Sequence, residues 1–161
     1  MFQALTPEVS GKIDGILQEL LVRAEADAVY LCDHAGNIIA RQTCADYSNE
    51  DNIAALAAGS FSATHELARL IGQPRFDYVF HRGENLSVYM QRAPSGMILM
   101  VMFGTVSNPG LVRVYAEEAI RELKPLLAGM ADEARMRESL AGVEMELDEH
   151  AEIFRREGGE A

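Results

Sequence analysis

The stretch IAALAAGSFSATHELARLIG, residues 53–72, decides how the rest of the chain is interpreted. It predicts a helix over 48–71 that begins with a capping box of Ser48 and Asp51 and ends before Gly72. At about 100° per residue, one side of this helix collects Ile53, Leu56, Ala57, Thr64, Leu67 and Ile71. We expect this apolar side to cover the protein's own β-sheet.

The other side of the same helix carries small residues where a solvated helix usually carries charge. It consists of Ala54, Ala55, Ala58, Gly59 and Ser62, followed by His65, Glu66 and Arg69. A glycine inside a helix costs about 1 kcal/mol relative to alanine, so Gly59 indicates that a neighbour approaches closely. The pattern favours an interface with another polypeptide. Packing within the domain and the plain helix propensity of alanine are the alternatives.

The segments before this helix predict a helix and a hairpin. Thr6 as N-cap and Pro7 at the first helical position predict a helix over 7–26. Two β-rich runs, 28–33 and 38–43, are joined by turn residues that include a glycine and an asparagine. Such a pattern is typical of a β-hairpin.

The segments after the helix predict a meander of three strands and a further helix. The strands are expected over 77–82, 86–92 and 97–103, with glycine-containing turns between them. The last strand, MILMVMF, is apolar at every position and is therefore expected to be covered on both faces. The helix that follows should start at Asn108 and end or kink just before Pro125.

The composition changes at residue 131. The segment 131–161 contains ten acidic and four basic residues, which is more than half of the net charge of -11. Its apolar residues at heptad-like spacing are Met136, Leu140, Val143, Leu147 and Phe154. We therefore divide the chain into a domain over 7–128 and an acidic amphipathic helix or tail over 131–161. The tail is expected to pack on its own domain or on the tail of another subunit.

Charge and composition exclude several classes of protein. A net charge of -11 and a pI near 4.7 argue against binding to nucleic acid or to an anionic membrane surface. No signal peptide and no apolar run long enough to span a bilayer are expected, so we predict a cytoplasmic protein. Cys32 and Cys44 form no CxxC motif, and Cys32 is expected to be a reduced, buried thiol.

The sequence contains no catalytic motif that we can identify. It lacks GxxxxGK[ST], HExxH, paired CxxC motifs and GxSxG, so we predict no catalytic residue, no cofactor and no metal site. Cys32 and His34 flank the start of a turn, and His81 ends a strand; both positions favour structural roles. The candidates for an arginine inserted into a partner's active site are Arg82, Arg92 and Arg113, and no pattern distinguishes among them.

The motifs together resemble a known family. LAAGSFSATHELARLIG (56–72), FHRGENLSVYM (80–90), the apolar strand after them and NPGLVR (108–113) resemble roadblock/LC7 (longin-related) domains, and within these a bacterial polarity regulator. The resemblance covers about residues 7–128. It implies an α+β sandwich of longin-like or profilin-like type, with the order αββαβββα and a five-stranded antiparallel sheet.

The resemblance also implies a function. Such domains form homodimers whose central helices pair and whose third strand, through Tyr78, Phe80 and Arg82, extends one sheet across the twofold axis. The paired helices bind a small Ras-like GTPase of the MglA type and stimulate GTP hydrolysis by positioning its own switch residues. The small-residue side defined above would then form the dimer and GTPase interface, and the tail could dock on the GTPase.

Two other functions stay open. A non-catalytic adaptor or scaffold for a GTPase or motor complex would use the same dimer, so the sequence does not separate it from an activating regulator. A small-ligand sensor of PAS or GAF type is less favoured, because the strands offer mostly methionine, leucine, valine and phenylalanine rather than polar groups.

Overall fold

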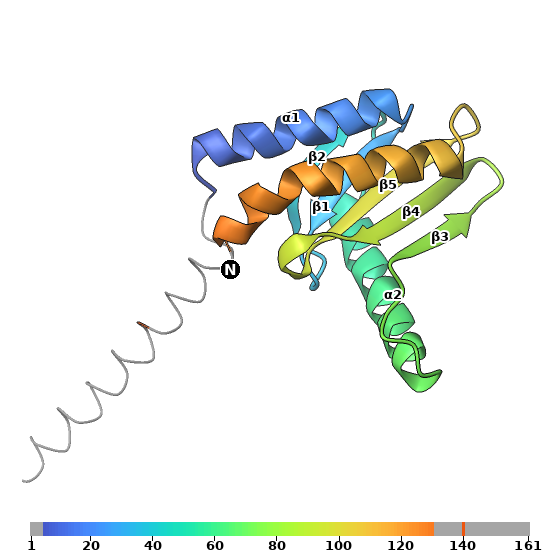
Figure 1. Cartoon of the computed structure of the whole chain (residues 1–161). Helices are drawn as coiled ribbons and strands as arrows, with labels where there is room; N and C mark the ends of the chain where they lie inside the picture. The colour runs from blue at the N-terminus through green and yellow to red at the C-terminus, as the bar shows by residue number, and fades with distance from the viewer. Residues whose placement is uncertain (1–4, 131–139, 141–161) are drawn as a thin grey trace, which may run out of the picture.

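The computed structural model describes residues 5–130 and Leu140 (Figure 1). The elements, in chain order, are α1 (Pro7–Arg23), β1 (Ala28–Cys32), β2 (Ile38–Thr43), α2 (Glu50–Leu70), β3 (Tyr78–Arg82), β4 (Leu86–Arg92), the short 3-10 helix η1 (Pro94–Gly96), β5 (Ile98–Gly104) and a helix over residues 109–130. The predicted order αββαβββα is confirmed. The domain boundary predicted after residue 128 stays a prediction, because the tail lies almost wholly outside the described residues.

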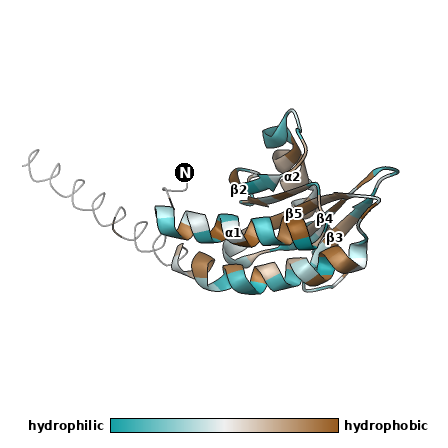
Figure 2. Cartoon of the chain, turned by 90° about the horizontal axis from the view of Figure 1, so that it is seen from above, coloured by the Kyte–Doolittle hydropathy of each residue, from teal (hydrophilic) through white to brown (hydrophobic). Residues whose placement is uncertain are grey.

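All five strands form one antiparallel sheet in the order β2-β1-β5-β4-β3. The predicted hairpin is β1–β2, and the predicted meander is β3–β4–β5. Figures 1 and 2 show α1 and the 109–130 helix side by side on one face of the sheet, with α2 on the other face. The outer strands, β2 and β3, therefore have edges that are not paired within the described part of the chain.

The two faces of the sheet have separate apolar cores. The core under α1 and the 109–130 helix includes Leu17, Leu99 and Phe103, and the core under α2 includes Tyr30 and Met100. β5 contributes to both, and its residues from Ile98 to Phe103 are all buried. The prediction that this apolar strand is covered on both faces is confirmed.

Local signals fix three of the six helix ends as predicted. The hydroxyl of Thr6 accepts a hydrogen bond from the amide of Val9 at 3.3 Å, and Pro7 opens α1. At the end of α2, Gly72 has a positive φ of 77°, and the amides of Gly72 and Gln73 donate to the carbonyls of Arg69 and Ala68. This is a Schellman motif, with glycine in the left-handed conformation that the motif requires.

Three predicted helix boundaries are wrong. α1 ends at Arg23 rather than at residue 26. The start of α2 is not a capping box of Ser48 and Asp51, since the N-cap is Asn49, which has a φ of 70° and makes no side-chain cap. The last helix continues past Pro125 to residue 130. Leu123 and Leu127 are fully buried on either side of the proline, and this packing outweighs one lost backbone hydrogen bond.

The orientation predicted for α2 is also wrong. The residues buried against the sheet are Ala54, Ala58, Phe61 and Ala68, of which the first two belong to the small-residue side. Of the side predicted to cover the sheet, Leu56, Leu67 and Ile71 are exposed, whereas Ile53 and Ala57 are partly buried against this core. The sheet beneath α2 carries the large side chains of Tyr30, Met90 and Met100, so only a helix side with small residues can approach it closely. Ala54 and Ala58 therefore contact the protein's own sheet and cannot form an interface with another chain.

Candidate functional site

One exposed side of α2 is apolar. Leu56, Leu67, Leu70 and Ile71 are between 52% and 76% exposed, although the sequence had indicated that most of this side covers the sheet. Gly59 and Ala63 are exposed between them. We call Leu56, Gly59, Ala63, Leu67 and Leu70 the open stripe of α2. A contiguous apolar stripe on an otherwise acidic protein is typical of an interface.

The open stripe has no charged residue along nearly four turns of helix. An added Cβ atom at Gly59 would meet no atom within 4 Å, so the glycine is not needed for packing within this chain. Figure 1 shows the C-terminal half of α2 extending past the strands. The stripe is therefore accessible to another polypeptide over its whole length.

The predicted interface residues that remain exposed are Ala55, Gly59, Ser62, His65, Glu66 and Arg69. Gly59 belongs to the open stripe, and Ser62 and Glu66 lie at its side. Glu66 and Arg69 form an ion pair with each other at 3.0 Å. The predicted interface is thus split, because two alanines face the sheet and the others face outward.

The turn between β1 and β2 contacts the N-terminal half of α2. Gly36 has a φ of 89°, and a Cβ atom placed on it would lie 2.4 Å from the Cα of Ala55. Asp33 shapes this turn, since its carboxylate accepts hydrogen bonds from the amides of Ala35 and Asn37 and from the side chain of Asn37. Burial tends to raise the pKa of Asp33, but these hydrogen bonds lower it on balance. The close approach of this turn thus explains why α2 has a small residue at Ala55.

Cys32, which lies just before this turn, is not a reactive thiol. Cys32 is buried, as predicted, and Cys44 is exposed; both are free thiols. Burial, followed by the charge of Asp33, raises the pKa of the Cys32 thiol to about 12. A thiol that stays protonated is a poor nucleophile.

The edge strand β3 presents two different faces. Tyr78 stacks on Tyr89 and Phe80 stacks on Phe103, with ring centroids 5.5 Å and 6.1 Å apart, so both lie on the side of the 109–130 helix. Arg82 is exposed at the end of the strand. The predicted dimer-strand residues therefore do not share a face with α2. What β3 offers to another chain is its unpaired backbone edge.

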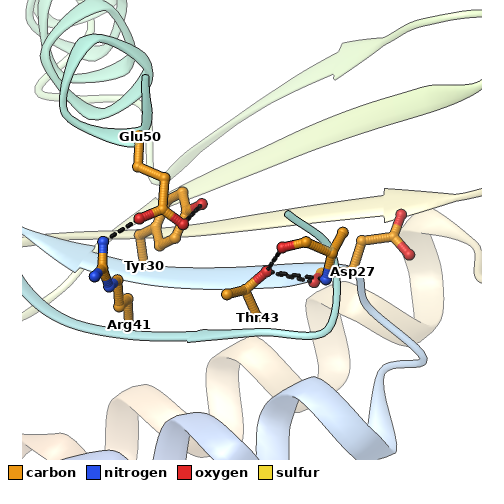
Figure 3. Close-up of polar contacts among 6 residues, drawn as sticks. Asp27, Tyr30, Arg41, Thr43 and Glu50 are labelled. Atoms are coloured by element: carbon orange, nitrogen blue, oxygen red, sulfur yellow. Dashed lines mark hydrogen bonds and ion pairs between the residues drawn. The ribbon is translucent and has the colours of Figure 1, made fainter. Parts of the chain in front are cut away.

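A polar contact fixes the start of α2 on the sheet (Figure 3). The hydroxyl of the buried Tyr30 donates a hydrogen bond to the carboxylate of Glu50 at 3.0 Å, and Arg41 of β2 forms an ion pair with the same carboxylate. Burial and the hydrogen bond to Glu50 raise the pKa of Tyr30, so its hydroxyl stays protonated and donates. Sequence reasoning missed this contact because it joins residues from three separate elements.

We expect Glu50→Ala to destabilise the protein by about 1–3 kcal/mol, because it leaves the buried Tyr30 hydroxyl without an acceptor. Glu50→Gln keeps an acceptor for Tyr30 and loses only the charge of the ion pair with the exposed Arg41, so it should cost less than Glu50→Ala. Urea unfolding at fixed protein concentration measures both. The double variant Tyr30→Phe/Glu50→Ala should be more stable than Glu50→Ala alone, and a strictly additive result would contradict this account.

The described residues contain no group of three or more histidine, cysteine, aspartate or glutamate side chains placed to hold a metal ion. Within the same part of the chain, no helix is long and apolar enough to cross a membrane.

Two other residues considered in the sequence lie at the surface. His81 is exposed on β3. Arg113 is engaged with Glu117 at 3.0 Å and lies over the ring of Tyr78.

The predicted docking seam of the tail lies outside the described residues, except for Leu140. Leu140 is helical and exposed. The roles suggested for Met136, Val143, Leu147 and Phe154 therefore stay predictions.

Residues 12–103 match the family model described as Roadblock/LC7 domain. The match runs from α1 to β5 and so includes α2 and β3. A search of curated protein sequences finds no match.

Solved structures of MglB proteins are similar to this chain over nearly their whole length. MglB from Myxococcus xanthus is 30% identical, with a TM-score of 0.73, over 80% of this chain and 96% of that chain. A structure of MglB with a tetrameric arrangement is 25% identical, with a TM-score of 0.75, over 79% and 96%. The gliding protein MglB from Thermus thermophilus is 27% identical, with a TM-score of 0.72, over 81% and 96%. The resemblance drawn from the sequence is confirmed.

Proposed function

Since this chain belongs to the roadblock/LC7 domain family, we propose that it is a homodimeric regulator that binds a small Ras-like GTPase and stimulates GTP hydrolysis. The observation that carries the proposal is the open stripe of α2. An apolar helix side that faces away from its own sheet is typical of a surface to which another polypeptide binds. The family match, which includes α2 and β3, and the likeness to MglB proteins support the assignment.

The order of residues in the open stripe supports a twofold dimer. In an antiparallel pair of α2 helices centred near Phe61, Leu56 of one copy lies opposite Leu67 of the other, and Gly59 lies opposite Ala63. Large residues then meet large ones at both ends, and small residues meet at the centre, where they let the helix backbones approach closely. An interface that repeats itself under a twofold axis needs this kind of self-complementarity.

The unpaired edge of β3 supports the same arrangement. β3 is five residues long and pairs only with β4 among the described strands. A second copy of β3 placed antiparallel to it would satisfy the free amide and carbonyl groups of both edges. The two α2 helices would then lie on the same face of a continuous sheet.

The GTPase is proposed to bind on the paired α2 helices. Ala55 and Ser62 are exposed and small, so a partner's backbone can lie close to the helix there. We propose that the GTPase's own residues complete its catalytic site. Arg113 is engaged within the chain, and Arg92 is partly buried, so neither is free to be inserted. Arg82 is exposed and, unlike Arg113, forms no ion pair within the described residues, so it stays a candidate.

Single-turnover GTP hydrolysis by the small Ras-like GTPase that binds this chain tests the proposal. We expect faster hydrolysis with the wild-type chain than without it. Ser62→Arg should leave the fold and the dimer intact and weaken GTPase binding at least about tenfold, because a long charged side chain cannot be accommodated in a close contact.

The adaptor function is the alternative outcome of this experiment. Binding of the GTPase without any change in its rate of hydrolysis would assign the chain to scaffolds rather than to activating regulators. If Ser62→Arg binds the GTPase with wild-type affinity, the GTPase binds elsewhere on the molecule. Cytoplasmic location and a bacterial role in cell polarity are further parts of the proposal.

A further inference from the structure

Arg92, the last residue of β4, has an unusual environment. Its guanidinium carbon lies 5.5 Å from the ring centroid of Phe61, and one terminal nitrogen lies 3.4 Å from Nδ1 of His65. Its Nε atom is buried and makes no hydrogen bond in the described part of the chain. A partly buried guanidinium is thus held against α2 by an aromatic ring and an imidazole, and no carboxylate of residues 5–130 pairs with it.

The nearby carboxylates are used by other arginines. Glu66 bonds to Arg69 and Asp77 bonds to Arg75, each at 3.0 Å, and all four side chains are at least 60% exposed. Exposed ion pairs of this kind contribute little to stability, whereas an unpaired charge that is partly buried is costly. The stability of the isolated chain therefore gives no reason for the absence of a carboxylate at Arg92.

We infer that Arg92 receives a carboxylate from the bound GTPase, and this inference rests on the proposed function. Glu66 and Asp77 balance the charges of Arg69 and Arg75 in these ion pairs, so Arg92 is the unbalanced positive charge among them, in a chain with a net charge of -11. The planar guanidinium presents several N–H groups in a fixed geometry that suits an aspartate or glutamate side chain. Phe61 and His65 limit the movement of Arg92 before the partner arrives.

The position of Arg92 favours the GTPase over the second copy as the source of the carboxylate. Arg92 contacts the side of α2 that bears Phe61 and His65. Ala63, at the centre of the open stripe, lies on the opposite side of the helix, about 200° from each of them. A second copy that covers the open stripe does not reach Arg92, so of the two proposed partners we assign the carboxylate to the GTPase.

Arg92→Met tests the inference in the full chain, because methionine keeps the aliphatic packing on Phe61 and removes the charge. Calorimetry with the GTPase that binds the wild type, loaded with a non-hydrolysable GTP analogue, should give a Kd about 10–100-fold higher. The thermal midpoint should not fall, since an unpaired charge has been removed. Arg92→Lys, which keeps the charge but not the planar group, should lose affinity only in part.

Arg121→Gln is the matched control, because Arg121 is exposed on the helix layer of the opposite face. It should bind the GTPase with wild-type affinity and wild-type salt dependence, whereas Arg92→Met should show a weaker salt dependence. Wild-type affinity of Arg92→Met would overturn the inference. So would a weaker dimer with unchanged GTPase binding, since the carboxylate would then belong to the second copy. If the wild type itself binds no Ras-like GTPase, the proposed function fails and the inference falls with it.

Discussion

Gly36→Ala is expected to destabilise the protein by about 3–5 kcal/mol. The residue has a φ of 89°, and its added Cβ would lie 2.4 Å from the Cα and 2.9 Å from the amide nitrogen of Ala55. Both atoms are backbone, so no side-chain rotation relieves the clash. The turn must move away from α2, and the contact between the β1–β2 hairpin and the helix is lost.

Gly72→Ala is the control that separates the clash from the backbone conformation. Gly72 has a similar φ of 77°, but an added Cβ would meet nothing within 4 Å. A left-handed alanine costs about 1–2 kcal/mol, so Gly72→Ala should lose only that amount. Urea unfolding of both variants at one protein concentration gives the comparison. Equal losses would mean that the hairpin turn does not press on α2 as described.

The elements of this fold are predictable because their signals are local. Thr6 and Pro7 start α1 through one hydrogen bond and one fixed dihedral angle, and Gly72 ends α2 through its positive φ. The hairpin and the meander follow from β-rich runs separated by turn residues. Signals of this kind act within a few residues, so one sequence contains all the information that they need.

The orientation of α2 was not predictable in the same way. Both sides of the helix lack charge over three turns, so helical periodicity offers two candidate sides and does not choose between them. The choice depends on the size of side chains in β1, β4 and β5, such as Tyr30 and Met100, which fill the space beneath the helix. That information is spread over strands distant in the sequence.

The polar contacts of the candidate site were missed for the same reason. Tyr30 and Glu50 are separated by 20 residues, and His65 and Arg92 by 27. Neither pair forms a motif with fixed spacing. Arg92 was noted in the sequence as a candidate for insertion, but only its burial against Phe61 distinguishes it from Arg82 and Arg113.

Ala58→Arg and Ala63→Arg should have opposite consequences, although the two residues lie on one helix. Ala58 is 1% exposed and packs in the core under α2, so an arginine there must bury a charge without a partner, and we expect the chain not to fold. Ala63 is exposed in the open stripe. Ala63→Arg should fold normally, as judged by circular dichroism.

The effect of Ala63→Arg should instead appear in the oligomeric state. In the proposed dimer Ala63 lies opposite Gly59 of the second copy, where two helix backbones approach most closely, and no room is left for an arginine. The dimer Kd should therefore rise at least about 100-fold, which corresponds to about 2.7 kcal/mol. Light scattering across a dilution series measures it. If Ala63→Arg dimerises with wild-type affinity, the open stripe is not the dimer interface. If Ala58→Arg folds, a different side of α2 faces the sheet.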